Sequence, residues 1–252
     1  MYFIDTHAHL FLDEFDDDRD IIINECINDG VNKIVNPNVD IHTVNGLLSL
    51  KNKYPDIIFP AIGLHPTSVK GDFKNQLTKL YDLIDKYNFV AIGEIGIDLY
   101  WDKTHFEEQK IAFETQIQWA REFELPLIIH TRNSFDVTFS IVSKYSDISG
   151  VFHAFTGNYE QAMKVIERNF YIGIGGIVTF KNSGLDKVIE KVPIENIVLE
   201  TDSPYLAPVP FRGKRNQPSY IRYVADHISK IKNISVEKVV ETTNSNALSL
   251  FF

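Results

Sequence analysis

The stretch that decides the fold opens the chain and reads Tyr2-Phe3-Ile4-Asp5-Thr6-His7-Ala8-His9. Its first four residues form a short apolar run, which is typical of a buried strand. The turn after that run carries two histidines, whereas an open, doubly wound sheet often has a glycine-rich first turn. The stretch therefore counts against an open sheet, which is the main competitor of a barrel here.

Seven further apolar runs follow, separated by longer amphipathic stretches. The eight predicted strands are Tyr2–Asp5, Lys33–Asn36, Ile57–Gly63, Phe89–Glu94, Leu127–His130, Gly150–His153, Phe170–Gly173 and Asn196–Glu200. The predicted helices include Asp17–Asp29, Gln76–Tyr87, Thr104–Glu122, Tyr159–Arg168, Leu185–Lys191, Pro218–Lys230 and Val236–Phe251. Thr104 with Glu107 fits a capping box, and Gly30 fits a helix stop. Strand and helix alternating in this way are typical of a (β/α)8 barrel. We therefore expect one α/β domain of the TIM type over residues 1–252.

Composition narrows the class of protein. The net charge of −9 argues against a protein that packages nucleic acid, which needs a basic footprint, but not against a nucleic-acid enzyme. The single cysteine, Cys26, excludes a disulfide framework and a cysteine-rich zinc module. No apolar run approaches the ~20 residues of a membrane span, and no signal-peptide pattern opens the chain. We expect a cytoplasmic protein with no membrane partner.

The strongest observation is where the polar residues fall. In a barrel, catalytic groups lie at the C-terminal ends of strands. Most of the predicted strands end in or run into such groups, namely His7, His9, His65, Glu94, His130, His153 and Asp202. Alternate strand residues point the same way, so the His-x-His pair aims two imidazoles at one point. Imidazole and carboxylate together suit first-row divalent metals, and the sequence predicts a metal site at this mouth.

Each of these residues also has a plainer interpretation. An isolated His-x-His is as often a pair of hydrogen-bonded histidines. Glu94 alone could be a rim carboxylate paired with a cation, and Asp202 alone would be a helix cap. Their joint occurrence favours metal ligands, with Asp202 also placed to take a proton from an attacking water. We interpret Glu200 as a supporting residue and Asp98 as a cap or turn residue.

Two further features suggest phosphate binding. Arg132 follows His130, and a guanidinium matches phosphate oxygens in pairs, although a plain ion pair is nearly as good an interpretation. The segment 208–217 contains Arg212, Lys214 and Arg215 within four residues of an otherwise acidic chain. These cations predict a phosphate-gripping lip. Composition alone would favour a solvated basic loop.

Five motifs occur in order along the chain: His-x-His, Gly-Glu-x-Gly-x-Asp, His-Thr-Arg, His-Ala-Phe-Thr-Gly and Leu-Glu-Thr-Asp-Ser-Pro-Tyr-Leu-Ala-Pro. In this combination the chain resembles the TatD family of metal-dependent deoxyribonucleases, which are amidohydrolase-type barrels. The resemblance implies two divalent metal ions, with magnesium or manganese favoured over zinc. It implies that His7, His9, Glu94 and Asp202 hold one ion, and that Glu94, His130 and His153 hold the second. It also implies hydrolysis of DNA ends or damaged DNA, with His65 near the substrate phosphate.

Two positions depart from the pattern of that family. Asn133 stands where the family commonly has an acid, and Gln217 stands where a glutamate follows Asn216. Asn133 can still cap the following helix. A charge-dependent role at that position, such as orienting His130, is not open to an amide, and the same holds for an acid-dependent role of Gln217.

These observations together predict a deoxyribonuclease, of the exonuclease type, in which two cations clamp the attacking and leaving oxygens and activate a shared water. Arg132 and His65 would stabilise charge on the phosphate. Two other classes stay open. An amidohydrolase or phosphotriesterase of small molecules commonly bridges its metals with a carbamylated lysine, where this chain has Glu94. A non-catalytic binding module would not need all six ligands. With DNA as substrate and no obligate protein partner indicated, we expect a monomer or weak oligomer.

Overall fold

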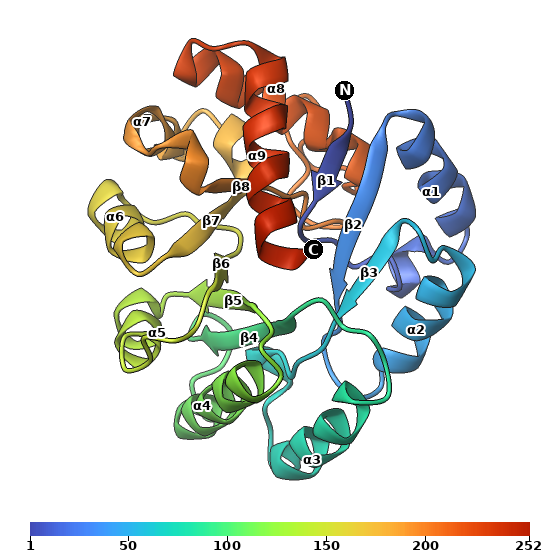
Figure 1. The fold of residues 1–252 in the computed structure, drawn as a ribbon, viewed down its shortest axis with the longest axis vertical. Helices are drawn as coiled ribbons and strands as arrows, with labels where there is room; N and C mark the ends of the chain where they lie inside the picture. The colour runs from blue at the N-terminus through green and yellow to red at the C-terminus, as the bar shows by residue number, and fades with distance from the viewer.

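The computed structural model describes residues 1–252 and contains eight parallel strands that alternate with helices (Figure 1). The strands are β1 (Phe3–Asp5), β2 (Val31–Pro37), β3 (Ile58–Ala61), β4 (Ile92–Asp98), β5 (Leu127–Arg132), β6 (Gly150–Phe152), β7 (Phe170–Ile174) and β8 (Ile197–Leu199). The helices are α1 (Arg19–Asn28), α2 (Val44–Lys53), α3 (Phe73–Ile84), α4 (Phe106–Glu122), α5 (Phe135–Val142), α6 (Tyr159–Glu167), α7 (Leu185–Lys191), α8 (Ile221–Lys232) and α9 (Val236–Phe251). No helix is long and apolar enough to cross a lipid bilayer.

The strands follow one another in chain order around the centre of the molecule. Continuous pairing joins β1 to β3 and β4 to β8, and an isolated bridge spans each of the two remaining seams. Ile62 bridges to Ile92 between β3 and β4, and Ala8 bridges to Ser203 just beyond β1 and β8. Figure 1 shows the helices arranged around the strands. The fold is the predicted (β/α)8 barrel.

The last helix, α9, lies across one end of the barrel (Figure 1). Two of its amides satisfy backbone groups at the N-terminal ends of strands: Asn244 bonds to Ile4 N and Tyr2 O, and Asn246 bonds to Ile197 O. Its apolar residues Ala247 and Phe251 pack on a buried cluster of strand residues, Ile4, Val35, Ala61, Ala91, Ile128, Val151 and Val198. This end is therefore closed and apolar, which leaves the C-terminal ends of the strands for polar groups.

Several element boundaries differ from those predicted. The capping box at Thr104 is wrong, because α4 begins only at Phe106, no side chain caps it, and the Thr104 amide donates to Asp102 instead. The helix stop at Gly30 is confirmed by its φ of +85°, which suits a residue without a side chain. Helices α2 and α5 were not among the predicted helices.

Candidate metal centre

The structure brings together every histidine and acid that the sequence placed at the barrel mouth. His7 and His9 follow β1, His153 follows β6 and Asp202 follows β8, while His130 lies within β5. His7, His9, Glu94 and His153 are buried, and His65, His130 and Asp202 are slightly more open. Five of the eight histidines of the chain thus share one small volume with two carboxylates.

Glu94 does not end its strand, as the sequence suggested, because β4 continues to Asp98. The register of β4 against β5 shifts at this point: Gly93 pairs with Ile128 and Ile95 pairs with Ile129. Glu94 is therefore the extra residue of a bulge. A bulge breaks the alternation of side chains along a strand. It lets a carboxylate from inside an apolar strand face the histidines.

The two oxygens of Glu94 face different sets of imidazoles. Oε1 lies 2.7 Å from His130 Nδ1, 2.7 Å from His153 Nε2 and 3.1 Å from His65 Nε2. Oε2 lies 3.2 Å from His7 Nε2 and 3.5 Å from His9 Nε2. Glu94 thus divides the site into a His7/His9 half and a His130/His153 half, and it belongs to both.

The His7/His9 half has the spacing of ligands on a single ion. His7 Nε2 and His9 Nε2 lie 3.1 Å apart, and Asp202 Oδ1 lies 3.8 and 3.6 Å from them. With metal–nitrogen bonds of ~2.0–2.1 Å, neighbouring ligands at tetrahedral or octahedral angles lie about 2.8–3.4 Å apart. The two ring nitrogens and Glu94 Oε2, at 3.1 to 3.5 Å, lie close to this spacing, and Asp202 Oδ1 lies slightly beyond it. Two ring nitrogens, Glu94 Oε2 and Asp202 Oδ1 therefore offer a donor set that fits a first-row divalent cation.

Hydrogen bonds on the outer ring nitrogens fix which nitrogen can bind a metal. His9 Nδ1 lies 3.0 Å from the Pro37 carbonyl, and His130 Nε2 lies 3.0 Å from Asp98 Oδ2. Both outer nitrogens must carry a proton to make these bonds, so the inner nitrogens present lone pairs to the centre. Metal-binding histidines usually donate their other ring N–H to a carbonyl or a carboxylate in this way.

In His65 the proton of the neutral ring lies on the nitrogen that faces the centre. Its Nδ1 accepts the backbone N–H of Thr67 at 3.2 Å, so the proton of a neutral ring sits on Nε2. That Nε2 faces Glu94 Oε1 and lies 3.4 Å from His130 Nδ1. His65 therefore presents an N–H donor to the centre, where His9 and His130 present lone pairs.

The electrostatics of the site separate its two acids. Burial opposes the charge on Glu94, but the imidazoles of His153, His65 and His7 outweigh it and hold the pKa of Glu94 well below its usual range. Burial raises the pKa of Asp202 to about 6, although His153 and His9 oppose this shift. Glu94 is thus held as an anion by its imidazole neighbours, and Asp202 is the more basic of the two acids.

Asp98 does more than the predicted turn role. Its Oδ1 accepts the backbone N–H of Tyr100 at 2.9 Å, which confirms the turn, and its Oδ2 holds His130. The spacing carried a signal for the second role, since Glu94 and Asp98 are four residues apart on one strand and share a face. The orienting acid that Asn133 could not supply is therefore present at Asp98.

Glu200 lies behind His153, as a supporting residue would. Its Oε1 accepts the Ala154 N–H at 2.6 Å and lies 3.8 Å from His153 Nδ1. Three buried atoms here have no hydrogen-bond partner: His7 Nδ1, His153 Nδ1 and Glu200 Oε2. Small shifts of these side chains would let Glu200 take an N–H from a histidine of each half.

The two positions that departed from the family pattern contribute little to the centre. Asn133 does not cap α5, because Ser134 occupies the N-cap position and Asn133 is exposed with a φ of +55°. Gln217 donates from Nε2 to Ser219 Oγ at 2.7 Å. The buried Asn216 beside it anchors the loop, since it bonds to the carbonyls of Thr201 and Tyr205.

The cations predicted to bind phosphate differ in how free they are. Arg132 is exposed and makes no ion pair, and its guanidinium carbon lies 3.8 Å from the Tyr100 ring centre. Arg212 and Lys214 are exposed and lie over Phe180 and Phe211 without an acidic partner. Arg215, in contrast, donates to both oxygens of Asp18, at 2.9 and 2.5 Å. The lip thus contains two free cations and one anchored cation.

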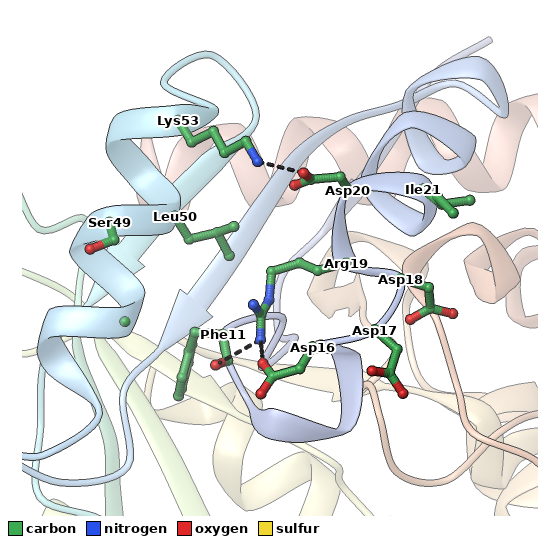
Figure 2. A pocket seen from close by; sticks show the side chains of 11 residues that line it. Phe11, Asp16, Asp17, Asp18, Arg19, Asp20, Ile21, Ser49, Leu50 and Lys53 are labelled. Carbon is green, nitrogen blue, oxygen red and sulfur yellow. Dashed lines mark hydrogen bonds and ion pairs between the residues drawn. The ribbon is translucent and has the colours of Figure 1, made fainter.

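A hollow on the flank of the barrel, between α1 and α2, is unconnected with this chemistry (Figure 2). Both of its cations are paired with acids of the protein: Arg19 with Asp16, and Lys53 with Asp20. Arg19 also donates to the carbonyl of Leu10 at 2.7 Å. The hollow therefore marks where Arg19 fixes the loop that follows the His-x-His pair.

Several known proteins are similar to this chain over nearly its whole length. A family model described as TatD related DNase matches residues 4–252. The uncharacterized metal-dependent hydrolase YabD of Bacillus subtilis is 38% identical over 250 residues, covering 98% of both chains. The Danio rerio protein tatdn3, whose name provisionally describes a deoxyribonuclease, is 31% identical over 261 residues, covering 99% of this chain and 97% of its own.

A solved structure is also similar to this one. The crystal structure of YjjV, a TatD homologue from Escherichia coli, superposes with a TM-score of 0.93 at 28% identity, covering 99% of this chain and 97% of that chain. The two structures are therefore similar over the whole barrel.

Proposed function

The chain belongs to the TatD-related DNase family, and on that premise we propose that it is a metal-dependent hydrolase that cuts phosphodiester bonds in DNA. The observation that carries this proposal is the position of Glu94, whose two oxygens face two separate groups of imidazoles. A carboxylate so placed suits a pair of cations, and paired cations are a common arrangement in enzymes that hydrolyse phosphoesters.

The residues that would hold the metals follow from the two halves of the site. His7, His9, Glu94 and Asp202 would bind one ion, and Glu94, His130 and His153 would bind the other. Two such ions supply Lewis acidity to the phosphate and hydroxide at neutral pH. Magnesium and manganese suit the carboxylates, and the imidazole-rich donor set also suits zinc.

The remaining steps belong to the protein itself. Asp202, which lies beside the histidines of the first half, would take the proton of the attacking water. His65 would donate a hydrogen bond from its Nε2–H to a phosphate oxygen, as its tautomer allows. Arg132 would hold a second oxygen through its free N–H groups. No covalent bond between enzyme and substrate is needed.

The lip at residues 208–217 would bind the DNA chain. Lys214 and Arg212 would meet the DNA backbone, and Arg215 would contribute mainly by holding the loop on Asp18. A few cations beside the scissile phosphate would let an acidic protein bind DNA, because they neutralise the phosphates that lie nearest to them.

The test uses protein stripped of metal and resupplied with magnesium, manganese or zinc, on end-labelled single- and double-stranded DNA. We expect no cleavage without metal, restoration by at least one ion, and loss of cleavage in Glu94→Gln. His227→Asn serves as control, since His227 lies on α8 away from the mouth. Full activity after complete removal of metal would refute the mechanism. Turnover of a cyclic amide or a phosphotriester but not DNA would favour a small-molecule hydrolase, and metal binding without any turnover would indicate a binding module.

A further inference from the structure

We propose that Tyr100, Trp101 and Arg132 form a subsite that stacks on an unpaired nucleobase next to the phosphate being cut. The inference rests on the proposed deoxyribonuclease activity and adds how one nucleotide of the substrate is held. It starts from side chains that neither the fold nor the metal centre uses.

Tyr100 and Trp101 are unusually exposed for large aromatic side chains. Trp101 has 71% of its surface exposed and Tyr100 has 52%, whereas Trp119, the other tryptophan of the chain, has only 6%. A single exposed aromatic side chain is ordinary in a soluble protein. Two in succession, beside a free arginine and at the mouth of a barrel, are typical of a binding surface.

The loop that carries these rings is fixed to the metal centre. Asp98 accepts the backbone N–H groups of Tyr100 and Trp101 on Oδ1, at 2.9 and 3.4 Å, and holds His130 on Oδ2. The Leu99 N–H donates to the Arg132 carbonyl at 2.9 Å. One carboxylate thus sets both the orientation of a candidate ligand and the start of the aromatic loop, so the rings lie one short loop away from the reacting phosphate.

Arg132 completes the surface. Its guanidinium carbon lies 3.8 Å from the Tyr100 ring centre and 5.3 Å from the Trp101 ring centre, and no acid pairs with it. A stacked guanidinium uses its face and leaves the N–H groups at its edge free. Arg132 can therefore hold a phosphate oxygen while the aromatic loop beside it holds the base. Aromatic faces next to cations are how proteins bind single-stranded nucleic acid without reading its sequence.

A hollow lies among the loops that carry these side chains. It is lined by residues after β4, β5 and β6, namely Leu99, Phe106, Thr131, Asn133, Phe135 and Phe155. Leu99 precedes Tyr100, and Thr131 and Asn133 flank Arg132 in sequence, so the same loops line the hollow and carry the stack. A base inside a duplex has both faces covered by its neighbours, so only a frayed or flipped base can enter.

Trp101 itself provides the direct readout. The experiment is a titration of the magnesium-loaded protein with a short phosphorothioate oligonucleotide, which resists cleavage, followed by tryptophan fluorescence. An identical oligonucleotide with one abasic residue next to the terminal phosphate is the comparison. Because Trp119 is buried, we expect the oligonucleotide to quench Trp101 and the abasic form to bind roughly 5- to 150-fold more weakly, the usual contribution of one stacked base.

Variants test the same surface through turnover. The unaltered protein should cleave an intact oligonucleotide with a higher kcat/KM than the abasic one. Tyr100→Ala and Trp101→Ala should lower this ratio to near one. Arg132→Lys should reduce it in part while it keeps the salt dependence of binding. Tyr87→Ala is the matched control, since Tyr87 is 45% exposed at the opposite end of the barrel. An unchanged preference in Trp101→Ala would overturn the proposal, as would equal quenching by both oligonucleotides.

The two proposals can fail separately. If the unaltered protein cleaves no DNA with any metal, the proposed function is wrong, while the fluorescence comparison still tests the subsite. If it cleaves DNA and ignores the missing base, the subsite is wrong and the proposed function stands. Quenching by detergent or apolar peptide, with none by the oligonucleotide, would show that the aromatic pair docks another class of partner.

Discussion

Replacing Glu94 by glutamine is the sharpest test of the site, because one side chain is asked to serve two ions. The substitution keeps the shape of the side chain but removes its charge. It also places an NH2 group opposite imidazole nitrogens that now lie between 2.7 and 3.5 Å from a carboxylate oxygen. The loss therefore falls on both halves of the site.

The size of the effect can be bounded. At an effective dielectric constant of about 20, a unit charge and a divalent cation about 4 Å apart attract by about 8 kcal/mol before desolvation is counted. Substituting an outer-shell partner of a metal ligand already weakens metal binding roughly 10- to 100-fold. We expect Glu94→Gln to weaken binding in each half by at least about 100-fold.

Calorimetric titration of the metal-stripped protein gives both the number of ions and their affinities. The unaltered protein should bind two ions. At metal concentrations that saturate the unaltered protein, Glu94→Gln should bind none. Asp202→Asn is the matched control, because Asp202 faces only His7 and His9, so that variant should keep the second ion. If Glu94→Gln binds two ions with normal affinity, or loses only one, the bridging role of Glu94 is refuted.

Three other predictions follow from the same geometry. Lys214→Ala should raise KM for DNA and lower the slope of log KM against log salt by about 1, whereas Arg215→Ala should first release its loop, seen as faster proteolysis within residues 208–217. If both variants leave KM and the salt slope unchanged, the loop is merely a solvated surface. Asp98→Asn should weaken only the ion of the His130 half, roughly 10- to 100-fold by titration, and an effect confined to the other half would contradict its role. Burial raises the pKa of Cys26 to about 12, so a thiol reagent should label it only after unfolding, and rapid labelling of the native protein would contradict that burial.

The barrel could be predicted from the sequence because its strands are short and apolar and end in charged or imidazole side chains. The less regular parts left weaker signals. Helix α5 has apolar residues at five of its eight positions, so no amphipathic periodicity marks it as a helix. Helix α2 buries Val44, Leu47 and Leu50 at helical spacing, but its sequence also contains a glycine and two asparagines, which lower its helix propensity.

Within the site, the residues could be predicted but their pairings could not. The stretch from Ile92 to Asp98 reads equally well as a strand that ends at Glu94 or as one that continues past it, since a bulge leaves no mark on hydrophobicity. The contact of Asp98 with His130 depends on the register between two strands. The ion pair of Arg215 with Asp18 joins residues 197 positions apart, which no local pattern reveals.

The way the strands are joined explains why Glu94 is so central. The residues of the first half are locked together by backbone bonds across the seam between β1 and β8: Asp202 N donates to His7 O, and His9 N donates to Ser203 O. The other half is held by β5 and β6, with Asp98 fixing His130 from β4. Each half is therefore rigid within itself.

Glu94, from β4, connects the halves across the mouth through contacts with histidines of both. The rings of His7 and His153 also stack with their centres 4.0 Å apart, and Glu200 beside β8 lies behind His153. With Asp98 and Asp202, the mouth gathers four carboxylates in a protein of net charge −9. These carboxylates repel a phosphate that approaches the mouth, and bound divalent cations would offset their negative charge. We therefore expect metal binding to precede DNA binding.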